Sequence, residues 1–222
     1  MTKVIILAAG QGKRLLPKTK HLPKCLVDLG GKPLLIKQIE LLHSLGLNDI
    51  SVVTGYLSKK ILNYCSKYKF NTIHNEHFKT TNMTFSLFYA INLIKNKLNK
   101  DIIIIYGDII YTKNVITKLV NARHNISVVI DSKWYDLWKM RMENPLDDAE
   151  TLIIDRKNNI KEIGKKTKNI NKIQGQYIGM FKINKNFINY AINIFNSLSN
   201  SVKNNLYLTD YLQIIINKKI EV

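Results

Sequence analysis

A short glycine-containing segment near the N-terminus carries the residue types that bind phosphate groups. It reads Leu-Ala-Ala-Gly-Gln-Gly-Lys-Arg over residues 7–14. Glycines let the backbone approach a ligand closely, and successive N–H groups in such a loop form a concave binding site for an anion. Lys13 and Arg14 add cationic donors suited to a triphosphate, and Lys24, fixed by the proline before it, is expected to reach the same phosphates. The segment therefore predicts polyphosphate binding.

Two common phosphate-binding loops do not fit this segment. A dinucleotide-binding loop needs a third glycine where Leu15 stands. A P-loop needs four spacer residues before its Gly-Lys pair and a Ser or Thr after it, but Gly12-Lys13 comes too early and Arg14 follows. The loop is therefore of another kind.

A carboxylate follows the most apolar run of the chain. Residues 102–106 are Ile-Ile-Ile-Ile-Tyr, and Gly107 and Asp108 come next. A carboxylate just past a central strand is well placed to hold Mg²⁺ between phosphates. Aspartate also favours turns and helix caps, so the residue alone leaves both roles open.

The elements that must position these residues alternate between strand and helix in the first half of the chain. We predict strands at 3–7, 50–54, 72–74, 102–106 and 126–130, and helices at 33–45, 58–68, 84–95 and 113–122. This alternation indicates an α/β fold with a parallel sheet covered on both faces. The loop then lies at the carboxyl ends of the strands, where open parallel sheets bind ligands.

The second half has a different rhythm. We predict a hairpin formed by 151–155 and 160–163, a strand at 176–183, and helices at 187–198 and 206–216. Residues 134–150 are polar, contain aromatic residues and Pro145, and predict a loop or lid. Because there is no internal repeat and no linker, we expect a single domain over residues 1–222.

Composition narrows the class of protein. The chain has 222 residues, of which 45% are hydrophobic, and this argues against disorder. The first apolar run, residues 4–9, is too short for a secretion signal or a membrane span, so we expect a cytoplasmic protein without a membrane partner. The net charge of +18 comes from scattered lysines without a stacking-aromatic motif, which favours a small polyanionic substrate over nucleic acid. Cys25 and Cys65 match no metal motif and are expected to be free thiols.

Taken together, the motifs resemble the signature of the nucleotidyltransferases that make nucleotide sugars and CDP-alcohols. The resemblance rests on Leu-Ala-Ala-Gly-x-Gly-x-Arg-Leu-x-Pro at 7–17, Pro-Lys-x-Leu at 23–26 and Gly-Lys-Pro-Leu at 31–34. It implies a Rossmann-like three-layer α/β/α fold with a mixed, mostly parallel central sheet, and Mg²⁺ as cofactor. It also implies that residues 1–131 bind the nucleotide and residues 132–222 the acceptor.

The resemblance assigns a role to each candidate residue of the nucleotide site. The expected catalytic residues are Arg14, Lys24 and Asp108, of which Lys24 neutralises charge on the α-phosphate and Asp108 binds the metal. The expected nucleotide-binding residues are Leu7, Ala8, Ala9, Gly10, Gly12, Lys13, Arg14, Lys24, Asn82 and Ser86. The family's second metal-binding carboxylate, in a Trp-x-Glu-Ile-Asp-like string, has no counterpart here. Asp210 matches a family segment in which the acid caps a helix.

The segment 75–87 is similar to the base-reading loop of phosphocholine cytidylyltransferases. Asn82 and Ser86 offer the donor and acceptor groups that a pyrimidine edge needs. Asn82 also fits the N-cap of the helix that follows, and the two roles are compatible. We therefore expect CTP rather than UTP.

The expected acceptor-binding residues are Asp131, Trp134, Glu162, Lys165, Lys166 and Tyr177. The segments 141–150, 162–166 and 174–179 are similar to cytidylyltransferases that activate phosphonates or, in the capsular phosphoramidate pathway, phosphoglutamine. Lys165 or Lys166 is expected to bind the acceptor's phosphate, and nearby acids its amine. Trp134, Tyr135 and Trp138 either form a cage for a quaternary ammonium or pack as part of a lid.

The leading prediction is a cytidylyltransferase that joins CMP from CTP to phosphoglutamine, phosphocholine or an aminoalkyl phosphonate, with release of pyrophosphate. Its product would serve capsule or surface-polysaccharide modification, and a homodimer is one expected assembly. The first alternative is a sugar-1-phosphate nucleotidyltransferase that uses UTP or dTTP. A non-catalytic nucleotide-binding protein and a basic nucleic-acid-binding protein are the others.

Overall fold

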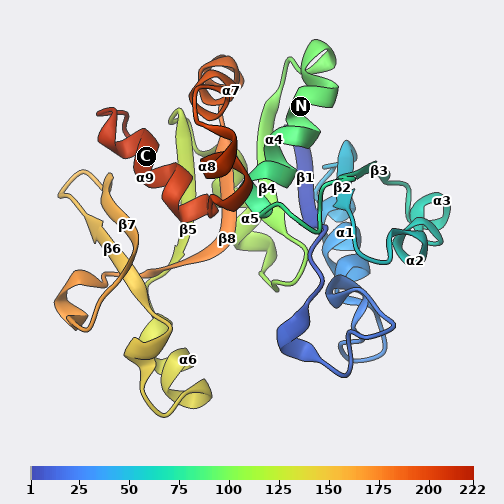
Figure 1. The fold of residues 1–222 in the computed structure, drawn as a ribbon, viewed down its shortest axis with the longest axis horizontal. Coiled ribbons are helices and arrows are strands. Elements are labelled where there is room, and N and C mark those ends of the chain that lie inside the picture. Colours follow the sequence, from blue (N-terminus) through green and yellow to red (C-terminus); the bar gives the residue numbers. More distant parts are fainter. Residues whose placement is uncertain (1) are drawn as a thin grey trace.

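The chain forms three layers around a six-stranded sheet, as Figure 1 shows; the computed structural model describes residues 2–222, the side chain of residue 97 excepted. The strand order is β3-β2-β1-β4-β8-β5. The strands are β1 (Thr2–Ala8), β2 (Ile50–Thr54), β3 (Asn71–His74), β4 (Asp101–Tyr106), β5 (Ile126–Asp131) and β8 (Gln176–Ile183). Strand β1 pairs in parallel with β2 and β4, and β2 with β3, whereas β8 is antiparallel to β4 and β5. The predicted mixed, mostly parallel sheet is confirmed.

Helices cover both faces of this sheet. One face packs against α1 (Leu34–Ser44), α2 (Ser58–Leu62), α3 (Cys65–Tyr68) and α5 (Lys113–Asn121), and the other against α4 (Met83–Ile94), α7 (Ile188–Asn196) and α9 (Leu208–Asn217). In β4, Ile103 and Ile105 face the first layer, and Ile102 and Ile104 face the second. All four are fully buried, which is why this strand is apolar throughout.

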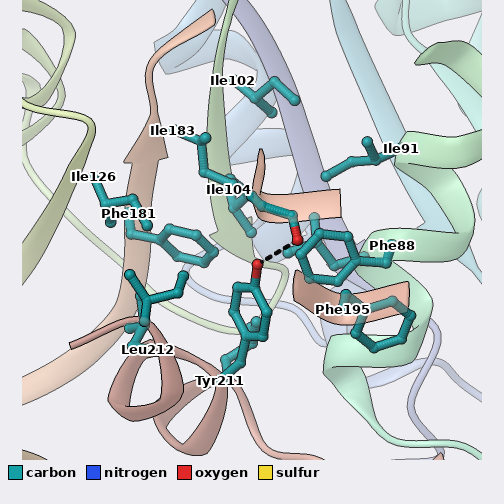
Figure 2. Close-up of a cluster of buried hydrophobic side chains, with 14 of the residues drawn as sticks. Phe88, Ile91, Ile102, Ile104, Ile126, Phe181, Ile183, Phe195, Tyr211 and Leu212 are labelled. Carbon is teal, nitrogen blue, oxygen red and sulfur yellow. Dashed lines mark hydrogen bonds between the residues drawn. The ribbon is translucent and has the colours of Figure 1, made fainter. Parts of the chain in front are cut away.

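An aromatic cluster joins the helices of the second layer to one another beneath the sheet (Figure 2). The Phe88 and Phe195 rings stack with centroids 4.4 Å apart, and the Tyr211 ring meets Phe88 edge-on at 4.8 Å. The Tyr211 hydroxyl donates a hydrogen bond of 2.7 Å to the Ala191 carbonyl oxygen, so its one polar atom is satisfied inside the core. Helices α4, α7 and α9 are thereby held in one arrangement.

A separate hairpin of β6 (Glu150–Ile154) and β7 (Ile160–Lys166) lies against α9 and projects from the sheet together with α6 (Trp134–Arg141), as Figure 1 shows. The Ile163 amide donates to Gln213 Oε1 of α9. In the turn, Asp155 Oδ1 accepts from the amides of Lys157 and Asn159, as a turn aspartate does. The predicted hairpin is therefore confirmed.

Two predictions about local structure are wrong, and one further helix was not predicted. Residues 134–150 are not a loop, because they contain α6 and a 3₁₀ turn at Pro145–Asp147. Helix α6 was not predicted because Trp134 is its only buried residue, so no apolar stripe marks it in the sequence. The helix predicted at 58–68 is divided into α2 and α3, with Asn63 and Tyr64 between them. A further helix, α8 (Asn200–Asn205), was not predicted, although the Ser199 hydroxyl accepts from the Val202 amide as an N-cap does.

Further 3₁₀ turns lie at Lys95–Lys97, Ile170–Lys172 and Lys185–Phe187. Among residues 2–222, no helix is long and apolar enough to cross a membrane.

Candidate active site

A cavity of about 300 Å³ opens where β1 and β4 end side by side. The amide of Gly107 donates to the Leu7 carbonyl, which joins the segments that follow the two strands. Its lining residues are Leu7, Ala8, Ala9, Gly10, Gly12, Lys13, Arg14, Leu15, Lys24, Cys25, Phe78, Thr81, Asn82, Met83, Ser86, Gly107 and Asp108. All ten residues predicted to bind the nucleotide, together with Asp108, therefore surround one space.

The glycine-containing loop turns sharply at Gly12. Its φ of +63° is a left-handed conformation that glycine adopts without strain. An added Cβ would lie only 3.1 Å from both Lys24 Cβ and Thr19 Cγ2. The buried Thr19 hydroxyl donates to the Gly12 carbonyl at 2.8 Å and braces the turn. A 3₁₀ turn, Lys13–Leu15, follows and brings the Lys13 and Arg14 side chains to the cavity.

Lys24 and Asp108 form an ion pair at the cavity wall. Lys24 begins a 3₁₀ turn, Lys24–Leu26, and Asp108 follows β4 after one glycine. The two side chains are 38% and 31% exposed, so both remain accessible to a ligand. The lining as a whole carries three cations, Lys13, Arg14 and Lys24, against the single carboxylate of Asp108. This balance favours a polyanion, since each cation lowers the energy of a bound phosphate.

Cys25, beside Lys24, lines the same cavity as a neutral thiol. Burial, with a smaller contribution from the nearby Asp108 carboxylate, raises the pKa of this thiol to about 12. A thiol in this state is a poor nucleophile at neutral pH. Both cysteines are free, as expected from the sequence.

The far end of the cavity is formed by the start of α4 and the segment before it. Ser86 lies on the first turn of α4, and its hydroxyl accepts a hydrogen bond of 2.9 Å from Asn75 Nδ2. Thr81 also accepts from Asn75 Nδ2, at 3.3 Å. This end therefore presents hydroxyl groups, whereas the loop end presents cations.

Asn82 occupies the N-cap position of α4, as expected, but its side chain does not cap the helix. Its Nδ2 donates to the Asn205 carbonyl at 2.9 Å, and its backbone amide donates to the Asn204 carbonyl. The amide group is thus tied to α8, a helix that was not predicted. Since Nδ2 is used in this way, the Asn82 side chain can bind a ligand through its Oδ1 atom, as a hydrogen-bond acceptor.

The six residues predicted to bind the acceptor do not line this cavity. Asp131 ends β5 and accepts from the Lys133 amide at 2.8 Å. Glu162 and Lys165 form an ion pair of 2.7 Å within β7, and this hydrogen bond holds the pKa of Glu162 below its usual range. Lys166, at the end of β7, is exposed and lies opposite Glu150 in the hairpin register.

Trp134 is buried, and its Nε1 donates to the Ile173 carbonyl at 3.3 Å. The Tyr135 and Trp138 rings meet the Trp134 ring edge-on, with centroids 5.4 and 6.1 Å away. The three rings pack against one another, which agrees with the packing interpretation rather than with an open cage.

Tyr106 links the cavity to the hairpin. Its ring contacts Tyr177 of β8 edge-on at 5.8 Å. Burial raises the pKa of Tyr106 well above its usual value, and the carboxylates of Asp108 and Glu150 raise it further. Both carboxylates therefore lie near this one hydroxyl: Asp108, which lines the cavity, and Glu150, which begins β6. The start of the hairpin is therefore adjacent to the cavity.

Several residues of the site were not predicted from the sequence. The Gln176 side chain forms two hydrogen bonds with the backbone of Glu150. Its Nε2 donates to the Glu150 carbonyl oxygen at 2.6 Å, and its Oε1 accepts from the Glu150 amide at 3.2 Å. Asn75 orients the hydroxyls at the far end of the cavity. Gly107 is needed because a Cβ there would lie 3.0 Å from the Leu7 carbonyl oxygen. Two of them had a signal: Gly107 by its position between a strand and Asp108, and Asn75 as the first residue of the segment 75–87.

A metal ion at this site would depend on a bound phosphate. Among residues 2–222, no group of three or more His, Cys, Asp or Glu side chains could hold a metal. Asp108 is one hard oxygen donor, and Mg²⁺ is usually held by one or two carboxylates together with substrate phosphates. The donor set therefore fits Mg²⁺ bound with a triphosphate. Asp210 caps α9 by accepting from the Tyr207 amide at 3.2 Å, which confirms its predicted structural role.

Two curated cytidylyltransferases are similar to this chain in sequence. The CTP:phosphoglutamine cytidylyltransferase of Campylobacter jejuni is 40% identical over 96% of this chain and 88% of its own length. The choline-phosphate cytidylyltransferase of Streptococcus pneumoniae is 39% identical over 46% of this chain and 43% of its own length.

Two solved structures share the fold. The CTP:phosphocholine cytidylyltransferase from Streptococcus pneumoniae superposes with a TM-score of 0.74 at 24% identity, over 100% of this chain and 87% of that one. The inositol-1-phosphate CTP transferase from T. maritima gives a TM-score of 0.70 at 22% identity, over 100% and 84%. Residues 4–150 match the model of the MobA-like NTP transferase domain. The residues that line the cavity lie within that same stretch, and the chain belongs to the MobA-like NTP transferase family and is a nucleotidyltransferase.

Proposed function

We propose that this nucleotidyltransferase is a Mg²⁺-dependent cytidylyltransferase that joins CMP from CTP to a small phosphorylated acceptor and releases pyrophosphate. The observation that carries the proposal is the cavity in which Lys13, Arg14 and Lys24 meet Asp108. Three cations suit a triphosphate, and the hydroxyl-lined far end suits a base. The 40% identity to a cytidylyltransferase over 96% of the chain supports the choice of CTP.

The proposed reaction is an in-line displacement at the α-phosphorus. A phosphate oxygen of the acceptor forms the new bond to phosphorus, and the bond to the bridging oxygen of the β-phosphate breaks, so that pyrophosphate leaves. The chain contributes positioning and neutralisation of charge rather than a covalent intermediate. Lys24 is the residue placed to neutralise charge at the α-phosphate, with Arg14 and Lys13 on the remaining phosphates.

Mg²⁺ would be held by Asp108 and the phosphates, and it would neutralise charge on the triphosphate. In the structure Asp108 is paired with Lys24. Binding of the metal nucleotide would therefore release Lys24 from Asp108 and leave its ammonium group for the phosphates.

Our leading acceptor is phosphoglutamine, with phosphocholine and aminoalkyl phosphonates as neighbours in the same class. The 40% identical relative is named for phosphoglutamine. On this chain the acceptor would lie between the cavity and the hairpin, with its phosphate next to the α-phosphorus, and Lys166 would bind a phosphate oxygen that does not attack. Glu150, next to Tyr106, is an acid within that region. We place the enzyme in the cytoplasm, where its product would serve capsule or surface-polysaccharide modification.

The test is a matrix of pyrophosphate-release assays. The protein is incubated with Mg²⁺ and each of CTP, UTP, dTTP, ATP and GTP, against phosphoglutamine, phosphocholine, 2-aminoethylphosphonate and glucose-1-phosphate. We expect release with CTP and phosphoglutamine, and none after chelation of the metal. Release only with UTP or dTTP and glucose-1-phosphate would replace the proposal by the sugar-nucleotide alternative. Absence of release with every pair would contradict it.

A further inference from the structure

Asn75 is a fully buried amide that follows β3 and lies behind the hydroxyl-lined end of the cavity. Its orientation is determined by one unambiguous partner. The backbone amide of His77 can only donate, and it lies 2.9 Å from Asn75 Oδ1. The other atom of the side-chain amide must therefore be the NH₂ group, which faces Ser86 and Thr81.

The two hydroxyls that receive this NH₂ group differ in where their own protons go. Thr81 Oγ1 lies 2.7 Å from the His77 carbonyl oxygen, which can only accept, so the Thr81 proton is used there. Ser86 Oγ has only a 3.5 Å approach to the Asn82 carbonyl, which is long for an O–H···O hydrogen bond. Ser86 is therefore an acceptor towards Asn75 with a proton available for a ligand in the cavity.

We propose that Asn75 is a positioning residue that sets nucleotide choice, because its NH₂ group occupies a lone pair of Ser86 Oγ and so directs the Ser86 proton, which has no short acceptor among the residues that the structure describes, to the base. The inference rests on the proposed function, in which the base of the nucleotide occupies the end of the cavity that Ser86 lines. It extends that function from a preference for pyrimidines to a physical cause for choosing one of them.

The two pyrimidines differ at the ring nitrogen N3. In cytosine N3 is an acceptor, whereas in uracil it carries a proton and is a donor. A hydroxyl that presents its proton forms a hydrogen bond with cytosine N3, but towards uracil it leaves two donors facing each other. A buried polar group without a partner is costly, so the mismatch lowers affinity. The orientation of the Asn75 amide thus favours CTP.

The experiment measures equilibrium dissociation constants of CTP and UTP in the presence of Mg²⁺ and without acceptor, so it does not depend on turnover. Wild-type protein is expected to bind CTP on the order of tenfold or more tightly than UTP. In Asn75→Asp, the carboxylate still accepts the hydrogen bond from the His77 backbone amide. Its other oxygen accepts from the Ser86 hydroxyl, so that Ser86 Oγ turns a lone pair rather than a proton towards the base. The ratio of the two dissociation constants should shift towards UTP by about tenfold.

Ser86→Ala and Thr81→Val separate this role from simple loss of packing. Ser86→Ala removes the donor and should bring the two dissociation constants to within about threefold of each other. Thr81→Val removes the other hydroxyl that accepts from the Asn75 NH₂ group. The proton of this hydroxyl is already donated to the His77 carbonyl oxygen. The substitution should change both affinities in proportion and leave their ratio within about twofold.

Thermal unfolding identifies any variant that fails to fold, and if Asn75→Asp is one of them, Ser86→Ala carries the test. The inference is overturned if wild-type protein binds both nucleotides equally, or if the ratio persists in Ser86→Ala. It is also overturned if folded Asn75→Asp keeps the wild-type ratio. Failure of pyrophosphate release with normal CTP binding would overturn the proposed function instead.

Discussion

The loop end of the cavity and the hairpin beside it are built in different ways. At the loop end, short segments follow adjacent strands, and Lys13, Lys24 and Asp108 meet in one space. At the hairpin, the candidate residues are spread over β5, α6, β7 and β8, and several are occupied by their own neighbours, as Glu162 is by Lys165. In the first region the charged groups lie around one space, and the Lys24–Asp108 ion pair is formed between two groups of the site itself, whereas in the second the candidate residues are dispersed and paired with their local neighbours.

The largest expected effect is at the loop end. Lys24→Ala should lower kcat roughly 10²- to 10³-fold, since it removes a charge placed at the reacting phosphate. The melting temperature should change little, because a partly exposed ion pair contributes at most about 1 kcal/mol. Steady-state kinetics and thermal unfolding measure the two. The control is Lys18→Ala, an exposed lysine of the same segment that does not line the cavity. Equal rates for the two variants would contradict the role of Lys24.

Gly10→Ala tests how closely the loop approaches the nucleotide. An added Cβ at Gly10 meets no atom within 4 Å, and its φ is not in the left-handed region, so folding should be unaffected. A bound triphosphate would occupy that open space, and we expect the KM for CTP to rise roughly tenfold or more. The result that counts against close approach is an unchanged KM with an unchanged melting temperature.

At the hairpin, Lys166 and Lys165 are adjacent and differ in their contacts. Lys165 is held by Glu162 at 2.7 Å, whereas Lys166 makes no ion pair with the residues that the structure describes. Lys166→Ala should raise the KM for the acceptor about tenfold without changing the KM for CTP, and Lys165→Ala by about twofold. Kinetics with each substrate varied in turn distinguish them. A larger effect from Lys165 would reverse the assignment.

The smallest expected effect concerns Glu150. Burial raises the pKa of this carboxyl, and the Asp210 and Asp148 carboxylates raise it further. The stabilising contribution of its neutral form is fully present below the ordinary pKa of glutamate, about 4.3, and is lost as pH rises through the raised pKa. Glu150→Gln should therefore raise the melting temperature by about 1–2 °C at pH 7, and not at pH 4.

Glu162→Gln is the matched control for Glu150, since the neighbouring Lys165 lowers the pKa of Glu162. It should give no gain at pH 7. Thermal unfolding of both variants across this pH range checks the sign. A gain for Glu162→Gln equal to that for Glu150→Gln would show that the effect is general charge reduction in a chain of net charge +18.

The same contrast explains what the sequence could predict. The strands and the cavity residues of the loop end follow from motifs of adjacent residues and from strand ends that meet at one edge of a sheet. The fully apolar residues 102–106 predicted a central strand because both of its faces are buried. In these places local pattern and tertiary environment agree.

Side-chain contacts that exist only in the folded chain could not be predicted from the sequence. Asn75 contacts Ser86 within the segment before and at the start of α4, and Asn82 is held by α8, more than a hundred residues away. Helix α6 was missed because it buries one tryptophan, so no periodic apolar face marks it. The Gln176 side chain is hydrogen-bonded to the backbone of Glu150, and no spacing of residue types indicates such a contact.

The position of β8 has a consequence for how the chain is made. Strands β4 and β5 leave the ribosome first, yet in the finished sheet β8 lies between them. Until residues 176–183 emerge, the edge of β4 with its isoleucines lacks its antiparallel partner, and β5 has no neighbour in the sheet. Unpaired apolar edges are sites of aggregation in nascent chains. The segments that line the cavity are synthesised early, but the sheet that positions them is complete only after β8 has been made.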